Sequence, residues 1–376
     1  MASLEENILR DCKRIVIKVG SALIIGNDSN LINTKFLTRI VTEITKFQNS
    51  GKEILLVSSG ALALGKKSLK IKKNNLKVAE KQAASSVGQV LLINAWKKAF
   101  LKYKKQCGQI LLTHLDAEIR SSAINARNTI ESLIKLNSIP IINENDTIAT
   151  QELRYGDNDQ LAARVAQITS SDLLILLSDV DGLYTSNPKK NASAKLIKYI
   201  KKITKLIEKS SEDTSSAVAV GGMHTKIKAA KIALSAGCNM LITRGNKESP
   251  ISSIINNGKF SLFLTNTSPK TARKKWISSQ MKVKGKIVID QGAEIALRKG
   301  ASLLPAGIVS ITGSFCKGDI VNVLNREKHV ICLGISAYPS KDAKIIAGAK
   351  SNEIQNLLGY HSRDVIIHRD DMVLRN

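Results

Sequence analysis

Two clusters of carboxylates and carboxamides near the middle of the sequence could hold a small polar ligand. Asn-Glu-Asn-Asp at residues 143–146 follows the apolar run 139–142, and Gly-Asp-Asn-Asp at residues 156–159 precedes an alanine-rich stretch with helical spacing. Ligands of open α/β sheets bind at the carboxyl ends of strands, where the first cluster would lie. Asp and Asn also cap helices and form turns. Two clusters that bracket one loop favour a binding site over turns alone.

Two lysines occupy positions from which they could bind an anion. Lys18 lies near the end of the apolar run 14–21, and Gly20 follows it. A lysine there is costly unless it is paired or reaches the surface along its own stem, and residue type alone leaves both possibilities open. Residues 221–222 are glycines that open a helix, with Lys226 in its first turns. Glycine at a helix start lets a phosphate approach the backbone, although a Gly-Gly pair often marks only a loop.

A third polar turn, Ser-Ser-Gly at residues 58–60, lies between a predicted strand and a helix start, which is a natural anion site. The following residues, 60–67, nearly match the P-loop pattern. Lys67 stands where that pattern needs Ser or Thr to reach Mg²⁺, and the interior Ala-Leu-Ala-Leu is typical of a helix. We therefore reject a P-loop here.

The scaffold for these side chains is predicted by apolar runs that alternate with amphipathic helices, the order of a parallel α/β fold. The helix 34–49 has one apolar stripe, and a helix at about 79–105 is expected to carry Val87, Leu91, Leu92 and Ala95 on its apolar side. The predicted fold class is a three-layer αβα sandwich with a mainly parallel sheet. Its strands are expected at 14–21, 53–57, 109–112, 139–142, 172–177 and 240–243.

The pattern changes after about residue 266, where polar, charged and proline residues predict a break between domains. We expect a first domain at 1–265, a linker at 266–280 and a small, mainly β domain at 281–376. Turn residues separate most of the short apolar runs in this last part. Its strands are expected at 285–290, 307–312, 319–324, 330–335 and 365–368.

The formal net charge of +26 raises the question of a nucleic-acid or acidic-lipid partner. The excess is mostly lysine, spread widely through a chain rich in Ile and Asn, which favours AT-rich codon usage as its source. Residues 281–376 hold 14 Lys and Arg against 9 Asp and Glu, a net of +5, so the charge is not concentrated on the tail. An RNA-binding tail is therefore the weaker interpretation.

Cellular location can be predicted from what the chain lacks. The apolar runs are too short to span a bilayer, and the first residues contain no apolar signal segment, so we expect a cytoplasmic protein without membrane attachment. The 5 cysteines show no CxxC spacing and are expected to be reduced thiols. No metal site formed by protein side chains is predicted.

Several motifs resemble those of the glutamate 5-kinases, a branch of the amino-acid kinase family. Residues 300–308 and 365–372 are similar to the PUA domain appended to those enzymes, so the resemblance covers nearly the whole chain. The motifs at residues 142–146 and 156–159 together separate this branch from uridylate, carbamate and acetylglutamate kinases. The motifs are Val-Ser-Ser-Gly-Ala (57–61), Ile-Asn-Glu-Asn-Asp (142–146), Gly-Asp-Asn-Asp (156–159), Ser-Asp-Val-Asp-Gly-Leu-Tyr-Thr (178–185) and Gly-Gly-Met-His-Thr-Lys (221–226).

The resemblance implies Mg²⁺-assisted transfer of a phosphoryl group from ATP to the side-chain carboxylate of L-glutamate, the first step of proline biosynthesis. It also implies a homo-oligomer, dimer or tetramer, and feedback inhibition by proline. Lys18 would contact the phosphates, Lys226 would stabilise the transferring phosphoryl group and Asp159 would orient both lysines. Glutamate is expected at Ser59, Gly60, Asp146 and Asn158. The nucleotide is expected at Lys18, Gly20, Ser178, Asp179, Val220, Gly221, Gly222, Met223, His224, Thr225 and Lys226.

Two positions depart from the pattern of this branch. Val220 stands where threonine is common, and His224 stands where a small residue is usual. Neither change removes a charge that the chemistry needs, so we expect altered nucleotide affinity and retained activity. On the sequence alone, a kinase of the same fold acting on a carbamate or an acylated amino acid remains an alternative.

Overall fold

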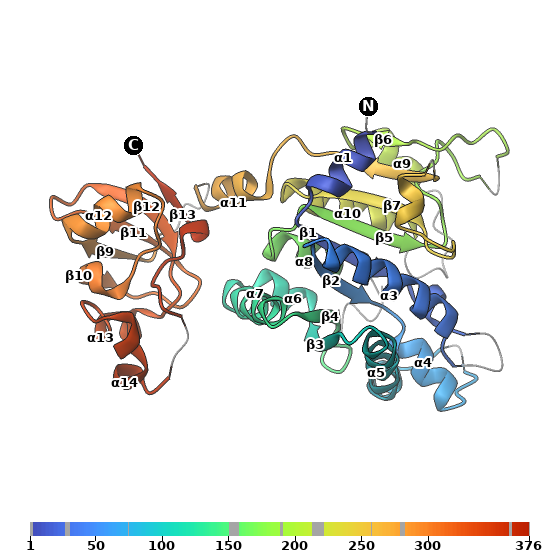
Figure 1. Cartoon of the computed structure of the whole chain (residues 1–376), viewed down its shortest axis with the longest axis horizontal. Helices are drawn as coiled ribbons and strands as arrows, with labels where there is room; N and C mark the ends of the chain where they lie inside the picture. The colour runs from blue at the N-terminus through green and yellow to red at the C-terminus, as the bar shows by residue number, and fades with distance from the viewer. Residues whose placement is uncertain are drawn as a thin grey trace. The chain divides into compact units, whose positions relative to one another are not determined.

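A computed structural model describes residues 3–26, 31–73, 75–149, 158–188, 191–212, 222–256, 258–278, 283–360 and 363–375, without the side chains of 209–212. The chain divides into two compact units (Figure 1). The first comprises Met1–Glu118 and Asn125–Pro269, and the second comprises Ile119–Ile124 and Lys270–Asn376.

The first unit is built on an 8-stranded sheet in the order β3-β4-β2-β1-β5-β7-β8-β6. The described pairings are parallel except for β7 with β8. The mainly parallel sheet predicted from the sequence is therefore confirmed. The strands are β1 (Arg14–Val19), β2 (Glu53–Ser58), β3 (Gln106–Leu112), β4 (Ser138–Glu144), β5 (Leu173–Ser178), β6 (Tyr199–Ile200), β7 (Asn239–Arg244) and β8 (Phe260–Phe263).

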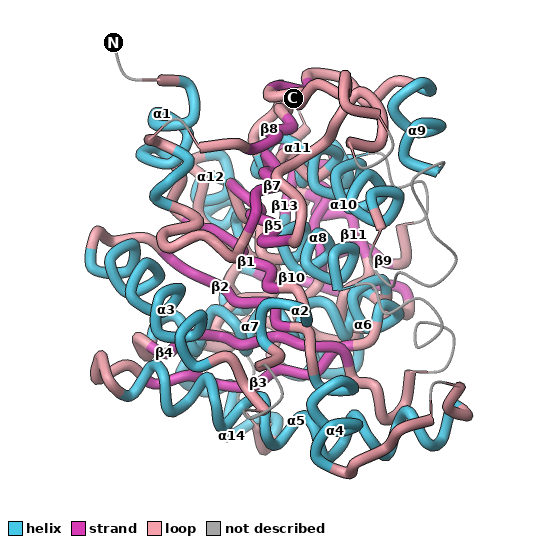
Figure 2. Tube along the Cα trace, turned by 90° about the vertical axis from the view of Figure 1, so that its right-hand side faces the viewer, coloured by secondary structure: helices cyan, strands magenta, loops and turns pink. Residues whose placement is uncertain are grey.

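Helices cover both faces of this sheet, as Figure 2 shows with α3 on one side and α8 and α10 on the other. The predicted three-layer sandwich is thus confirmed. The helices of this unit are α1 (Leu4–Asp11), α2 (Ser21–Ile24), α3 (Thr34–Asn49), α4 (Ala61–Ser68), α5 (Val78–Leu101), α6 (His114–Glu118), α7 (Arg120–Lys135), α8 (Asn158–Ile168), α9 (Lys205–Glu212), α10 (Met223–Ser235) and the 3-10 turn η2 (Ser252–Ile254).

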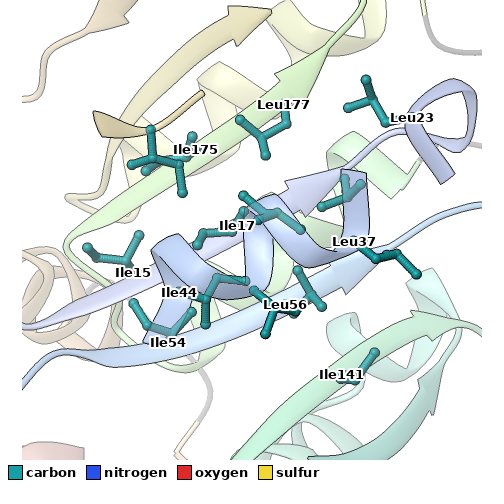
Figure 3. Close-up of a cluster of buried hydrophobic side chains, with 14 of the residues drawn as sticks. Ile15, Ile17, Leu23, Leu37, Ile44, Ile54, Leu56, Ile141, Ile175 and Leu177 are labelled. Carbon is teal, nitrogen blue, oxygen red and sulfur yellow. The ribbon is translucent and has the colours of Figure 1, made fainter. Parts of the chain in front are cut away.

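Strand alternation decides which face each β1 side chain reaches. Ile15 and Ile17 pack with Leu37 and Ile44 of α3 in one buried cluster, drawn in Figure 3. Because successive side chains of a strand point to opposite faces, Lys18 is directed to the other face, which α8 and α10 cover. The alternation of side chains along β1 therefore places Lys18 on the same face of the sheet as residues 158–159 and 222–226.

Several sequence predictions need correction in this unit. The sheet does not end at β7, because β8 and the short β6 continue it. Val87 is 37% exposed, whereas the predicted Leu92 is buried, and the buried face of α5 also includes Ser85, Gly88 and Gln89. The rejected P-loop segment forms helix α4, in agreement with the prediction.

The second unit is a 5-stranded sheet in the order β10-β9-β11-β12-β13, with its own apolar core. Residues 365–368 do not form the predicted strand: Ile367 makes an isolated bridge to Leu303, and the last strand is β13. The predicted linker contains helix α11, whose Arg273 pairs with the buried Asp371 of the same unit at 2.5 Å. Its elements are α11 (Pro269–Ser278), β9 (Gly285–Ile289), α12 (Gln291–Arg298), η3 (Pro305–Gly307), β10 (Ile308–Gly313), β11 (Ile320–Leu324), β12 (Val330–Ile335), α13 (Ser340–Ile345), η4 (Ser351–Glu353), α14 (Ile354–Leu358), η5 (Arg369–Asp371) and β13 (Met372–Leu374).

Among the described residues, no helix combines the length and the apolar character that a membrane span requires.

Candidate active site

Two lysines that are far apart in the sequence converge on one buried carboxylate. The Nζ atom of Lys18 lies 2.5 Å from Oδ1 of Asp159, and the Nζ atom of Lys226 lies 2.9 Å from Oδ2. The three side chains are almost fully buried. The ammonium groups therefore lie side by side at the carboxyl end of the sheet.

Each of these three side chains is placed by a different element. Lys18 extends from β1, the strand that β2 and β5 flank. Asp159 lies in the first turn of α8, where the helix dipole favours a carboxylate. Lys226 lies near the start of α10, which packs beside α8. The convergence depends on three elements meeting at one edge, so sequence spacing could not have predicted its distances.

The electrostatics of this triad favour an ionised carboxylate at Asp159. Burial alone would raise the pKa of Asp159, but the ammonium groups of Lys18 and Lys226 more than offset this effect and hold the pKa well below its usual range. Two cations and one anion leave a local charge of +1 inside a buried site. Such a site attracts an anionic ligand such as a phosphate.

The amino end of α10 offers space for that anion. Gly222 is the N-cap of the helix, and among the described residues no side chain makes a capping hydrogen bond there. A Cβ added at Gly222 would meet no described atom within 4 Å. The N–H groups at a helix N-terminus next to a lysine suit a phosphate. Thr225 Oγ1 contacts Asp159 Oδ2 at 3.4 Å, while Val220 and Gly221 lie outside the described residues.

The predicted nucleotide residues on the sheet side lie at the ends of β1 and β5. Ser178 Oγ donates a hydrogen bond to Oδ1 of the adjacent Asp179 at 3.0 Å. The Gly20 N–H donates to the Leu177 carbonyl at 3.3 Å. The Gly20 N–H therefore already has an acceptor at the sheet edge, and a nucleotide contact at Gly20 stays a prediction. Met223 and His224 are half-buried in the first turn of α10.

A further ion pair stands beside this edge and was missed in the sequence. Arg244, the last residue of β7, donates from Nε to Asp181 Oδ1 at 3.1 Å and from a terminal nitrogen to Oδ2 at 3.2 Å. The sequence offered one signal, because Asp181 belongs to the 178–185 motif, but nothing indicated its partner. The paired register of Ser178 with Arg244 in neighbouring strands explains the contact.

We expect Arg244→Ala to raise KM for the nucleotide predicted from the sequence, ATP, by about fivefold, since a partly buried two-point ion pair contributes roughly 1 kcal/mol to holding the turn after β5. Steady-state kinetics at saturating second substrate would measure the change. Lys247→Ala is the control, because Lys247 Nζ lies 3.9 Å from Asp181 and contributes less. Equal KM values for ATP in the two variants would contradict the expected role of Arg244.

Two of the predicted glutamate residues, Ser59 and Asn158, form a second polar group with Asn143 at the ends of β2 and β4. The Nδ2 atom of Asn158 donates to Ser59 Oγ at 3.0 Å and to Asn143 Oδ1 at 2.8 Å. In the part of the chain that the structure describes, Asn158 Oδ1 is buried without a hydrogen-bond partner. A buried acceptor without a donor is costly, so this oxygen suits a ligand that brings an N–H group.

The turn that carries Ser59 requires an unusual backbone. Gly60 has φ of +117°, a left-handed conformation that side chains rarely adopt, and helix α4 begins at the next residue. The Ser59 N–H is fixed to the Val19 carbonyl at 3.0 Å, which ties this turn to the strand carrying Lys18. The two halves of the site are therefore held by one sheet edge.

Asp146 lies in the turn after β4, three residues along the chain from Asn143. Burial raises the pKa of Asp146 to about 6, while the hydroxyl of Ser85 on α5 acts in the opposite direction. The carboxylate is therefore mainly ionised at neutral pH and half-neutralised about one pH unit lower.

Comparisons with known proteins identify the family of this chain. The amino acid kinase family matches residues 13–244, and the PUA domain matches residues 285–358. The chain belongs to the amino acid kinase family. A glutamate 5-kinase from Bradyrhizobium diazoefficiens is 46% identical over 100% of both chains. One from Sinorhizobium fredii is 48% identical over 97% of this chain and 93% of its own. Among solved structures, UMP kinase from Ureaplasma parvum has a TM-score of 0.48 at 19% identity, covering 67% of this chain and 99% of that chain.

One polar residue of the site, Asn143, was omitted from the sequence predictions. Asn143 is only 4% exposed, and its Oδ1 atom accepts a hydrogen bond from Asn158. It belongs to the first polar cluster, which supplied the signal, but only Asp146 of that cluster was assigned to the ligand. Because Asn143 orients Asn158, it joins the group of candidate substrate-site residues.

Proposed function

We propose that the chain is a glutamate 5-kinase, which transfers the terminal phosphoryl group of ATP to the side-chain carboxylate of L-glutamate. The observation that carries this proposal is the convergence of Lys18 and Lys226 on Asp159, beside the polar group of Ser59 and Asn158. The full-length similarity to proteins named glutamate 5-kinase supports it.

The site supplies what the reaction requires. A glutamate side chain has a pKa near ~4.3, so it is ionised at pH 7 and needs no general base. Two like unit charges ~4 Å apart repel by roughly 4 kcal/mol at an effective dielectric of about 20. Lys18 and Lys226 would offset this repulsion. A carboxylate oxygen forms the new bond to the terminal phosphorus as the bond to the bridging oxygen breaks, and ADP leaves.

Substrate positioning is assigned to the second polar group. The ionised Asp146 would pair with the α-ammonium group of glutamate, and Asn158 Oδ1 would accept one of its N–H donors. Ser59 and Gly60 would hold the substrate from the end of β2, the strand next to β4 in the sheet. Fixing the amino acid at its α-carbon end places the side-chain carboxylate in line with the phosphate.

Mg²⁺ is assigned to the bound nucleotide. The ion usually takes most of its ligands from phosphate oxygens and water, and it would neutralise phosphate charge. The described residues contain no group of three or more potential metal-ligating His, Cys, Asp or Glu side chains.

The raised pKa of Asp146 predicts a pH dependence. Protonation below pH about 6 removes the charge that would hold the α-ammonium group, so kcat/KM for glutamate should fall about tenfold between pH 7 and pH 5. Asp146→Asn should have a low kcat/KM without the limb near pH 6. A wild-type profile that stays flat down to the titration of glutamate itself would contradict this role of Asp146.

Formation of an acyl phosphate is the direct test of the proposed function. Hydroxylamine traps glutamyl 5-phosphate as a hydroxamate, so purified protein with ATP, Mg²⁺ and L-glutamate should give hydroxamate together with ADP. Aspartate, a carbamate and an acylated glutamate in parallel reactions would reveal a different acceptor. ADP release with one of these and none with glutamate would overturn the proposal.

Three further parts of the proposal follow from the same similarity. Proline is proposed as a feedback inhibitor, and the hydroxamate assay with added proline tests it. A dimer or tetramer is proposed and can be checked by light scattering. The 5 cysteines are free thiols, which supports a reducing, cytoplasmic location.

A further inference from the structure

Helix α5 carries three hydrogen-bond donors at intervals of seven residues, and none of them belongs to the site described above. Gln82, Gln89 and Trp96 each donate a side-chain N–H to a polar segment at the carboxyl end of the sheet. Seven residues are close to two helical turns, so the three side chains share one face of α5. Sequence periodicity had predicted an apolar stripe for this helix, with Val87 in it.

The two glutamines hold the loop that contains Asp146. Gln89 Nε2 donates to the Glu144 carbonyl at 3.1 Å, and Gln82 Nε2 donates to the Ala149 carbonyl at 3.3 Å. Their acceptors lie on either side of Asp146 in the chain. Gln89 is itself oriented by Gln109 of β3, whose Nε2 donates to Gln89 Oε1 at 3.3 Å. The loop is thus fixed at both of its ends by one helix.

Trp96 holds the other strand of the substrate group. Its indole N–H donates to Ser58 Oγ at 2.9 Å, and both residues are fully buried. Ser58 immediately precedes Ser59, the proposed glutamate contact. One rigid helix therefore reaches both the Asp146 loop and the Ser59 turn.

A close crossing of two helices fixes the position of α5 along its axis relative to the Ser59 turn. A Cβ at Gly88 would lie 1.7 Å from the Ala61 carbonyl oxygen, and a Cβ at Gly65 would lie 1.7 Å from the Ala84 carbonyl oxygen. Only glycine allows this backbone contact between α5 and α4, the helix that starts directly after Gly60. The crossing leaves α5 little freedom to slide along its axis.

We propose that α5 is the positioning element of the glutamate site, with Gln89 and Trp96 as positioning residues that set the spacing between Asp146 and Ser59. This inference rests on the proposed function. A buried glutamine in a helix is expensive unless its amide is satisfied, and leucine would fill the same space without that cost. The amides of Gln82 and Gln89 therefore serve the loop, while Trp96 also packs in the apolar core.

The first test is Gln89→Met, which keeps the side-chain length and removes the donor. KM for glutamate should rise about tenfold, equivalent to about 1.4 kcal/mol, while kcat and KM for ATP stay within about twofold. Asn94→Met is the matched control, because Asn94 is an exposed residue of the same helix. Gln82→Met, at a half-buried position, provides a second variant if Gln89→Met folds poorly, and a rise of about threefold is expected.

The second test uses Trp96 as a reporter of the site. The chain has 2 tryptophans, so Trp276→Phe leaves Trp96 as the sole indole. L-Glutamate without ATP should change its fluorescence in a saturable manner, and Gln89→Met should weaken the apparent affinity about tenfold, matching the change in KM.

The outcomes separate the two proposals. If wild-type protein forms no hydroxamate from glutamate, the proposed function fails. If wild type forms hydroxamate but Gln89→Met and Gln82→Met change KM for ATP as much as KM for glutamate, or change neither, the positioning role of α5 is wrong. A Trp96 signal that does not respond to glutamate would overturn the link between α5 and the Ser59 turn.

Discussion

Replacing Lys226 by alanine is expected to lower turnover by about 100-fold or more, because its ammonium group would offset charge that develops on the transferring phosphoryl group. Lys18→Ala should have an effect of similar size. The hydroxamate assay at saturating ATP and glutamate measures both. The local fold should survive each change, because the remaining lysine still neutralises Asp159.

Lys228→Ala is the matched control for this prediction. Lys228 lies on the same helix, two positions after Lys226, but its side chain is exposed. It should therefore retain wild-type turnover, which would show that lost charge on α10 as a whole is not the cause. Near-full turnover in Lys226→Ala would remove this lysine from the reaction.

The scaffold could be predicted from the sequence where the residues of one element contain the signals for its own start, end and apolar face. The bounds predicted for the helix 34–49 are those of α3, because Asn33 caps its start and its apolar stripe has a clear period. β6 was missed because a strand of 2 residues has no readable alternation. Residues 365–368 were wrongly predicted as a strand from their apolar character. Ile366 and Ile367 are indeed buried, but one bridge is the only strand pairing described for these residues.

The candidate site was predictable in its residues and not in its contacts. The positions of the two lysines, the polar cluster at 156–159 and the family resemblance pointed to Lys18, Asp159 and Lys226, but only the folded chain brings both lysines to the Asp159 carboxylate. Arg244, Asn143 and the polar face of α5 were missed for a common reason. Each acts through a partner on another element, and the register between elements leaves no trace in local sequence spacing.

Asp159→Asn is expected to be the most damaging single change, since it leaves two buried ammonium groups without their shared counter-charge. Breaking a buried ion pair by removing one partner costs about 3–5 kcal/mol, which corresponds to a fall in melting temperature of about 10 °C for a unit of this size. Turnover should fall at least as far as in the lysine variants, because the two ammonium groups would repel each other.

The pH dependence of this loss has a definite sign. The folded pKa of Asp159 is held below its ordinary value of 3.8, so its stabilising contribution is present above that value and is lost as pH falls through the range below it. The difference in unfolding free energy between wild type and Asp159→Asn should therefore have its full size at pH 7 and decrease below pH about 4. Chemical denaturation at a series of pH values measures it.

ATP should partly rescue the Asp159→Asn variant, because the phosphates would supply the missing negative charge to Lys18 and Lys226. We expect a larger ATP-induced rise in melting temperature than in wild type. Glu43→Gln is the matched control: Glu43 is a buried carboxylate that accepts backbone N–H groups from Ile251 and Ser252, so its loss should destabilise the fold without enlarging the ATP effect. Equal ATP shifts in Asp159→Asn and Glu43→Gln would show that the two lysines do not receive the nucleotide phosphates.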